Sequence, residues 1–241
     1  MGDTMRYFKR LCFGIIILIC CIIGIFIGLG YSNYKTAIQQ FPIHQKVSQI
    51  QSSKHYVTID QVSKNLLEAT VAIEDHRFYD HFGIDMIGIG RAFLHNIQKR
   101  NIVSGGSTIT QQLAKNMYYD NSPSIIRKIG EVFLAFDLER KYSKNMILEL
   151  YVNIIHYGDD YIGIQAASEG YFGVSAKELN LAQSSLLAGL PQSPSNYGLS
   201  KFYDRALIRQ ETVLNAMVKK GIITESQKLE VKGSNPQLNK S

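Results

Sequence analysis

The hydrophobic pattern divides the chain into two parts. Residues 11–31 form a run of 21 residues without a charged side chain. As a helix this run spans roughly 31 Å, close to the hydrocarbon thickness of a bilayer. It exceeds the apolar core of a cleaved signal peptide and ends without a typical small-residue cleavage site. The pattern therefore predicts a retained transmembrane helix.

Beyond the anchor, apolar positions from about residue 57 to 200 follow a helical period interrupted by glycine loops, and alternating strand patterns are nearly absent. The stretch 179–190 is apolar on almost every side, which predicts a buried helix. A last long helix is expected over 204–220, and we assign the fold class as mainly α. Helix-start signals stand at Asp85, Thr108 with Gln111, Ser122-Pro123 and Ser143.

The charge pattern sets the expected topology. Arg6, Lys9 and Arg10 precede the anchor, which places the N-terminus in the cytoplasm. The net charge of the chain is +6, of which the first ten residues carry +2, so +4 lies outside. The expected parts are a cytoplasmic tail (1–10), the anchor (11–31), a juxtamembrane connector (32–56), one folded domain (57–222) and a C-terminal tail (223–241), whose last residues, 234–241, are expected to be loose.

Composition excludes several classes of function. With 45% hydrophobic and 19% charged residues, the chain is globular rather than disordered. Cys12, Cys20 and Cys21 all lie in the apolar run, so the outer domain has no disulfide, zinc-thiolate site or thiol nucleophile. The basic residues are scattered and match no nucleic-acid-binding motif, so nucleic acid is not an expected partner.

The first candidate cluster runs from Glu74 to Asp85 and follows an apolar helix. It begins with two adjacent carboxylates, Glu74 and Asp75. A carboxylate at the end of a buried helix is partly desolvated, which raises its pKa toward that of a useful general base. The alternative interpretation is a pair of solvated loop acids.

The second cluster, Gly105–Asn116, places two glycines before a hydroxyl-rich helix start. Free backbone N–H groups there suit a phosphate or pyrophosphate, and Lys115 follows two turns into the helix. The G-K-[ST] order of a Walker A loop is absent. An ordinary capped turn explains the local sequence equally well.

The third cluster contains Arg127, Lys128 and Glu131. Arg127 and Glu131 are four residues apart and share a helix face. One interpretation is a surface ion pair between Arg127 and Glu131, which contributes little to stability. The other is a site in which Arg127 and Lys128 hold a leaving phosphate and Glu131 is a second carboxylate.

The fourth cluster, around Asp159 and Asp160, lies among small residues. These acids could bind a cation, although two solvated loop acids are the simpler interpretation.

In this order and spacing the clusters resemble one family, the peptidoglycan glycosyltransferases (glycosyltransferase family 51). The resemblance covers roughly residues 57–200. The matching residues are Glu74, Asp75, Phe78, His81 and Gly83 of E-D-x-x-F-x-x-H-x-G; Gly105 to Asn116 of G-G-S-T-I-T-Q-Q-x-x-K-N; Arg127, Lys128 and Glu131 of R-K-x-x-E; Ser143 to Asn153 of S-K-x-x-I-L-E-x-Y-x-N; and Leu187 to Pro194 of L-A-G-L-P-Q-x-P.

The resemblance implies a helical, lysozyme-like fold and an enzyme of peptidoglycan synthesis. Such an enzyme polymerises lipid II into β-1,4-linked glycan strands with inversion, and it releases undecaprenyl pyrophosphate. The implied partners are lipid II, the growing glycan chain, membrane lipids and other cell-wall synthesis proteins.

The resemblance also implies residue roles. Glu74 would be the general base and Glu131 the second acidic residue. A divalent cation, Mg²⁺ or Mn²⁺, is expected, with Glu131 and Asp75 as candidate ligands, and no organic cofactor is expected. The expected substrate-binding residues are Asp75, Phe78, His81, Gly106, Ser107, Thr108, Gln111, Gln112, Lys115, Asn116, Arg127 and Lys128.

Four positions depart from the family pattern. Gly130 stands where many members carry a basic residue, Pro123 where some carry arginine, Gln183 where glutamate is usual, and Val174 where lysine is frequent. The carboxylate pair is intact, so we expect activity, with donor-site affinity that is weaker or supplied by other cations such as Lys141.

About 40 residues follow the last motif, too few for a transpeptidase domain, so a monofunctional transglycosylase is expected. Ser32 to Lys35 fits S-x-x-K by spacing, but it abuts the anchor and no K-T-G follows. Two rival functions are a lysozyme-like glycan hydrolase, since paired carboxylates also serve glycosidases, and a non-catalytic cell-wall scaffold.

Overall fold

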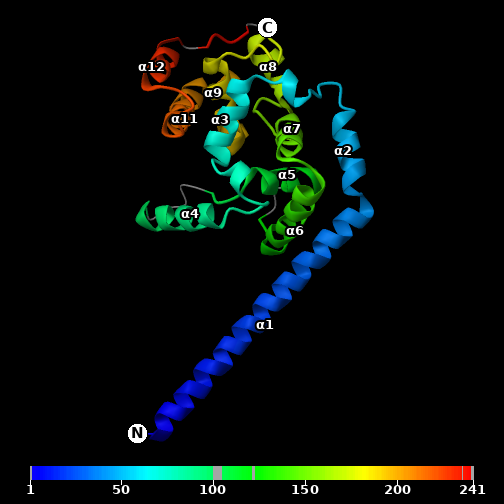
Figure 1. Ribbon diagram of the computed structural model, residues 1–241, viewed down its shortest axis with the longest axis vertical. Coiled ribbons are helices and arrows are strands. Elements are labelled where there is room, and N and C mark those ends of the chain that lie inside the picture. The colour runs from blue at the N-terminus through cyan, green and yellow to red at the C-terminus, as the bar shows by residue number, and fades with distance from the viewer. Residues whose placement is uncertain (1, 100–104, 121–122, 235, 240–241) are drawn as a thin grey trace.

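The protein, seen in a computed structural model, consists of helices and their connections (Figure 1). The structure describes residues 2–99, 105–120, 123–234 and 236–239. Within these ranges, the β pairing consists of two isolated bridges, Phe82–Ile84 and His156–Ile162. The prediction of a mainly α fold is confirmed.

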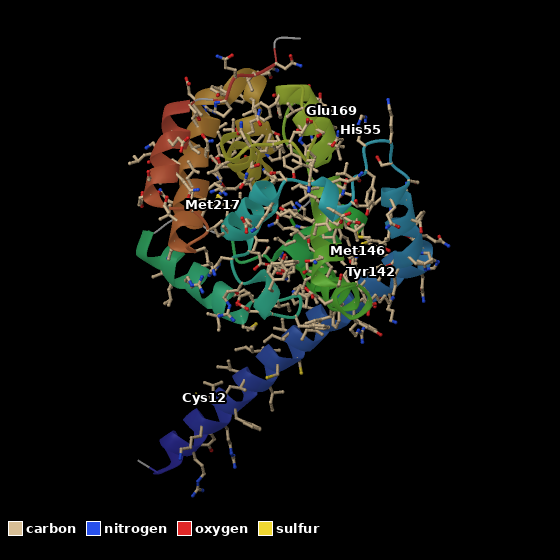
Figure 2. The ribbon with its side chains drawn as sticks, turned by 45° about the horizontal axis from the view of Figure 1, so that its top comes forward. Cys12, His55, Tyr142, Met146, Glu169 and Met217 are labelled. Atoms are coloured by element: carbon tan, nitrogen blue, oxygen red, sulfur yellow. The ribbon has the colours of Figure 1, made fainter. Side chains whose placement is uncertain are left out.

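The first helix, α1 (Gly2–Gln40), extends away from the rest of the molecule (Figure 1). Its stretch Lys9–Gln40 is long and apolar enough to cross a membrane. Cys12 lies on its projecting part, far from the other helices (Figure 2). The helix continues past residue 31, and α2 (Ile43–Gln51) begins directly after Pro42. The expected connector is therefore largely helical.

The remaining helices form the folded domain, in which α3, α9 and α11 pack together and α5 lies against α6 and α7. Short 3-10 turns cover Ile59–Gln61, Phe78–Asp80 and Leu190–Gln192. The helices are α3 (Lys64–Glu74), α4 (Met86–Lys99), α5 (Ile109–Tyr118), α6 (Ile125–Lys141), α7 (Lys144–Ile154), α8 (Ile164–Phe172), α9 (Leu181–Gly189), α10 (Pro194–Tyr197), α11 (Leu199–Lys219) and α12 (Glu225–Ser234).

The buried helix predicted over 179–190 is α9. Asn180 and Gln183 form a capping box at its start, and Leu186 and Leu187 are fully buried. Because α3 packs against α9, the end of α3 that carries Glu74 is held by the core of the domain.

Most predicted helix starts are confirmed. Thr108 caps α5 in a capping box with Gln111, Ser143 caps α7, and Asp85 accepts a hydrogen bond from the backbone N–H of Ile87 at 3.1 Å. Helix α6 instead begins at Ile125 with Ser124 as its cap. Ser122, the cap expected from sequence, lies outside the described residues.

The C-terminal part differs from the expectation. Helix α11 begins at Leu199 rather than at residue 204, with non-helical backbone at Phe202. A further helix, α12, follows, and its Val231 belongs to the same buried apolar cluster as Met217 and Ile223. Residues 225–234, which the sequence analysis assigns to the C-terminal tail, therefore form a helix that packs on the domain.

The outer end of α1 packs closely against α6. A Cβ at Gly30 would lie 2.4 Å from Cγ2 of Ile129, so only glycine permits this approach. The Tyr31 ring meets Phe133 edge-on at 5.2 Å between centroids, and the Tyr34 hydroxyl donates to Asp137. Helix α1 is thus part of the tertiary structure and not only a tether.

Replacing Gly30 with leucine should weaken this packing by about 1–3 kcal/mol, because overpacking forces the two helices apart. The measurement is thermal unfolding of the full chain in detergent micelles by circular dichroism. Gly28→Leu is the matched control, because a Cβ at Gly28 meets nothing within 4 Å. Equal melting temperatures for the two variants would contradict the packing described.

Candidate active site

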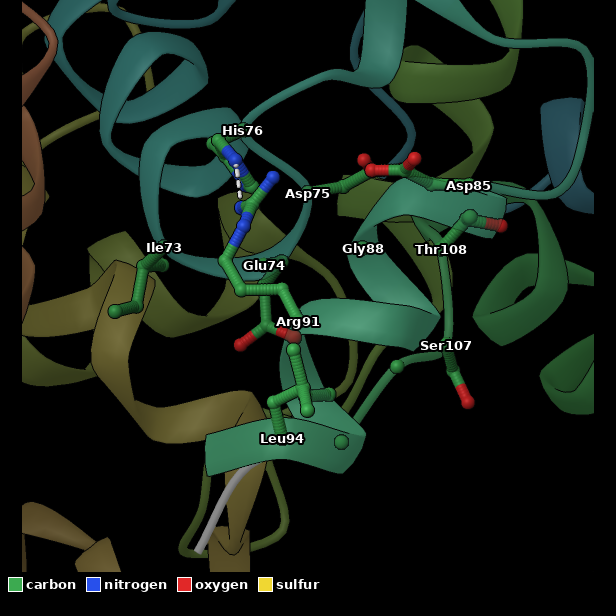
Figure 3. Close-up of a pocket in the computed structure, with 13 residues that line it drawn as sticks. Ile73, Glu74, Asp75, His76, Asp85, Gly88, Arg91, Leu94, Ser107 and Thr108 are labelled. Atoms are coloured by element: carbon green, nitrogen blue, oxygen red, sulfur yellow. Dashed lines mark hydrogen bonds between the residues drawn. The ribbon is translucent and has the colours of Figure 1, made fainter. Parts of the chain in front are cut away.

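Glu74 and Asp75 stand at the end of α3, and their side chains diverge. Glu74 is the last residue of the helix, and Asp75, its C-cap, has φ −156° and ψ 74°. Figure 3 shows Glu74 pointing into a cavity, whereas Asp75 points toward Asp85 and Thr108. The two neighbouring carboxylates therefore have different surroundings.

Glu74 lies at the junction of two cavities. The larger one, about 950 Å³, is lined by residues of α5, α6 and α11. The smaller one, about 510 Å³, extends toward α4 and is shown in Figure 3. Both are also lined by Ile73, Gly105 and Ser107. A group bound in one cavity can therefore meet a group bound in the other beside Glu74.

The surroundings of Glu74 suit a proton acceptor. Its Oε2 accepts a hydrogen bond from Gln112 at 2.7 Å. Among the described residues its Oε1 accepts no hydrogen bond, and the nearest cation is the Arg209 guanidinium, 3.8 Å away. Burial raises the pKa of Glu74; the Gln112 hydrogen bond and the Arg209 charge oppose this shift, and the Asp75 charge adds to it. A raised pKa and a free oxygen are properties of a general base.

Asp75 lines the smaller cavity and also joins two helices. It is 5% exposed, its Oδ2 accepts the backbone N–H of Ile109 at 3.0 Å, and Nε2 of His81 lies 2.9 Å away. Ile109 is the first residue of α5, so this contact fixes the start of α5 against the end of α3. Gln112, one turn along α5, is thereby brought to Glu74.

Residues of the glycine loop contribute to the site in two ways: they line the cavities, and they fix the loop. Gly106 and Thr108 line the smaller cavity, Gln111 lines the larger one, and Ser107 lines both. Thr108 and Gln111 are buried and hydrogen-bond each other in the capping box; the Thr108 hydroxyl also donates to the carbonyl of Gly83 at 2.7 Å. These two side chains hold the loop in place.

A cluster of charges lines the opposite wall of the larger cavity. Glu131 is 1% exposed and pairs with Arg127 and, at 2.8 Å, with Lys128. Lys128 also donates to the Ser107 hydroxyl at 2.7 Å. The buried carboxylate therefore orients two cations toward the glycine loop.

Lys115 adds a third cation to this wall. Its ammonium has no hydrogen-bond or ion-pair partner among the described residues. Burial and the charges of Arg127 and Lys128 lower its pKa, and Glu131 opposes them. An anion in the cavity would supply the missing partner, and a pyrophosphate provides oxygens for several cations at once.

The structure adds two cations that the sequence interpretation missed. Arg205 and Arg209 of α11 line the larger cavity. They lie beyond the recognised motifs, so local spacing gave no sign of them. In the structure, a Cβ at Gly189 would lie 2.9 Å from Cγ of Arg209, so this motif glycine makes room for the arginine.

Some predicted site residues lie elsewhere. Phe78 is fully buried in the core, His81 is 5% exposed and bonded to Asp75, and Asn116 is exposed; none of the three lines either cavity around Glu74. Lys141, expected as a replacement cation, is at the far end of α6 and outside both cavities. Asp159 accepts hydrogen bonds from Ser200 and Tyr171 and so ties α11 to α8.

The departures at Gly130 and Gln183 have structural reasons. A Cβ at Gly130 would lie 2.6 Å from the Tyr119 hydroxyl and 2.9 Å from Oδ1 of Asn33, because α1 packs there. Gln183 serves in the capping box of α9. Val174 packs against the hydrophobic core of the domain. Nothing in the structure explains Pro123.

The candidate metal ligands do not fit a cation held by the protein. Among the described residues, no group of three or more His, Cys, Asp or Glu side chains could hold a metal ion. Asp75 already contacts His81 and Ile109, and Glu131 already pairs with two cations.

The chain matches a known family and several penicillin-binding proteins. The transglycosylase family model matches residues 42–218. Penicillin-binding protein 1A of Neisseria flavescens is 42% identical over 175 residues, covering 73% of this chain and 22% of that protein. The protein of the same name from Aquifex aeolicus is 44% identical, covering 72% and 24%, and that from Vibrio cholerae is 35% identical, covering 92% and 29%.

The chain thus spans between 22% and 29% of the length of these relatives. The family match covers well over half of the chain, includes Glu74 and Glu131, and agrees with the helical, lysozyme-like fold that the motifs imply. The chain belongs to the transglycosylase family.

Proposed function

We propose that the protein is a peptidoglycan glycosyltransferase that polymerises lipid II into β-1,4-linked glycan strands and releases undecaprenyl pyrophosphate. The observation that carries the proposal is Glu74, a carboxylate with a raised pKa at the junction of two cavities, one of which is lined by cations. Family membership supports the reaction class.

In the proposed reaction, Glu74 acts on the acceptor sugar and the cations of the larger cavity act on the leaving pyrophosphate. Glu74 removes the proton from the 4-hydroxyl of the acceptor sugar, and the oxygen forms a bond to the anomeric carbon of the donor. The bond from that carbon to the lipid pyrophosphate breaks with inversion. Lys115, Arg127 and Lys128 neutralise the leaving pyrophosphate, an electrostatic stabilisation that grows in the transition state.

The proposed location is the membrane surface. The length and apolar character of α1 support a single span, and the charges at Arg6, Lys9 and Arg10 support a cytoplasmic N-terminus. Helix α4 presents further exposed apolar side chains, including Met86 and Ile97. The catalytic domain is then outside the cytoplasm, where its lipid-linked substrate is.

Glu74→Gln should lower the polymerisation rate about 10²–10⁴-fold, because glutamine keeps the shape but cannot accept the proton. The measurement is chain formation from labelled lipid II by the purified full chain. Glu68→Gln on the same helix is the control, since Glu68 pairs with Lys64 at 3.5 Å on the surface of α3.

The rival functions give different results in this assay. A glycan hydrolase would shorten preformed glycan and form no chains from lipid II. If the protein is a scaffold, neither the wild type nor Glu74→Gln should polymerise lipid II. The variant should then support growth in cells as well as the wild type does.

Arg209→Gln should move the acid limb of the pH profile of kcat/KM to higher pH. A general base must be deprotonated, so activity rises with pH through its pKa. The Arg209 charge lowers the pKa of Glu74, and removing this charge therefore raises that pKa further. Arg205 lines the same cavity, and its guanidinium lies over the Phe202 ring. Arg205→Gln should therefore leave the acid limb of the pH profile unchanged. An unshifted or acid-shifted limb in Arg209→Gln would refute this coupling.

Any divalent cation in the reaction, Mg²⁺ or Mn²⁺, is proposed to be held by the substrate pyrophosphate rather than by the protein. EDTA should then leave the melting temperature of the substrate-free protein unchanged, and millimolar Mg²⁺ should not raise it. A cation-dependent melting temperature would show that the protein itself binds the metal.

A further inference from the structure

A third cavity, of about 410 Å³, lies where α1 meets α6; we call it the junction pocket. None of its described lining residues belongs to the two cavities around Glu74. The lining residues are Tyr31, Tyr34, Lys35, Phe82, Phe133, Phe136 and Arg140.

The junction pocket lies at the depth of lipid headgroups, given the membrane placement of α1 proposed above. The apolar run of α1 ends at Tyr31. Lys35 follows one turn later, about 6 Å further along the helix axis. The headgroup layer on one side of a bilayer is of similar thickness, about 5–8 Å.

The walls of the pocket are aromatic and partly exposed. Phe82 and Phe136 stack with ring centroids 6.3 Å apart, and Tyr31 meets Phe133 edge-on. Phe82 is 52% and Tyr31 44% exposed. Exposed aromatic side chains are typical of the membrane–water interface. Because the walls are aromatic, the pocket suits the glycerol region of a lipid better than it suits a soluble ion.

Two cations, Lys35 and Arg140, line the pocket. The Lys35 ammonium lies 5.5 Å and 5.6 Å from the Tyr31 and Tyr34 ring centroids and has no carboxylate partner among the described residues. Asp137 is bonded by both Tyr34 and Arg140, so its charge is already matched. The Arg140 side chain is 66% exposed, which leaves its other N–H groups open to a ligand.

We propose that the junction pocket binds the phosphate of an anionic bilayer phospholipid, such as phosphatidylglycerol, in the leaflet that faces the catalytic domain. Lys35 and Arg140 donate hydrogen bonds to the phosphate oxygens, and the aromatic walls cover the glycerol. The bound lipid would hold the α1–α6 junction at a fixed depth.

The test uses the full chain in phosphatidylcholine nanodiscs with spin-labelled lipids. Electron paramagnetic resonance gives the association of labelled phosphatidylglycerol relative to labelled phosphatidylcholine. The wild type should prefer phosphatidylglycerol, and Lys35→Gln/Arg140→Gln should reduce this preference about fivefold or more. Polymerisation by this variant should stay near the wild-type rate, because neither residue lines the cavities around Glu74.

Lys64→Gln/Lys177→Gln is the charge-matched control, since both lysines lie outside the junction pocket. Arg6, Lys9 and Arg10 are unchanged in both variants, so their attraction for anionic lipid is common to both. An equal loss in the control, or equal association of the two labels, would overturn the headgroup site.

Two further outcomes distinguish the headgroup site from the proposed enzyme function and membrane placement. Displacement of labelled phosphatidylglycerol from the pocket by lipid II or by inorganic phosphate at equal concentration would assign the pocket to those ligands and overturn the proposal. Absence of protein-associated signal for every label would overturn the membrane placement of α1, and the headgroup site with it, whereas the polymerisation assay reports on the enzyme function separately.

Discussion

The arrangement of the two cavities around Glu74 depends on one buried carboxylate, that of Asp75. It contacts His81 and the first backbone N–H of α5, and so joins the end of α3 to the start of α5. Because Glu74 precedes Asp75 and Gln112 is one turn inside α5, the 2.7 Å contact between them follows from this link. A buried donor that loses such an acceptor costs about 1–3 kcal/mol, so position and stability are maintained by the same contact.

The charges on the opposite wall are arranged before any substrate binds. Glu131 pairs with Arg127 and Lys128, and Lys128 also contacts the glycine loop through Ser107. Paired cations do not need to reorganise when negative charge develops on a leaving group, and this is how preorganised electrostatics accelerates a reaction. Lys115 lacks such a pair among the described residues, and burial lowers its pKa, so an incoming anion would favour its charged form.

Local sequence predicted the features that depend on neighbours along the chain. The capping box of Thr108, the cap at Ser143, the buried α9 and the transmembrane-length apolar helix all follow from spacing within a few residues. The contribution of Arg209 depends on the packing of α11 against α9, which no local pattern encodes. The core position of Phe78 and the helix at 225–234 were missed for a similar reason, since tertiary burial decides them.

The absence of a side chain at Gly30 has a mechanical consequence. Helix α1 continues unbroken from its apolar run into its contact with α6, the helix that carries Arg127, Lys128 and Glu131. A bilayer thinner or thicker than the apolar run changes the tilt of a single helix. If α1 spans a membrane as proposed, such a change of tilt would turn the cavities around Glu74 relative to the membrane surface, and the orientation of the proposed site would then depend on bilayer thickness.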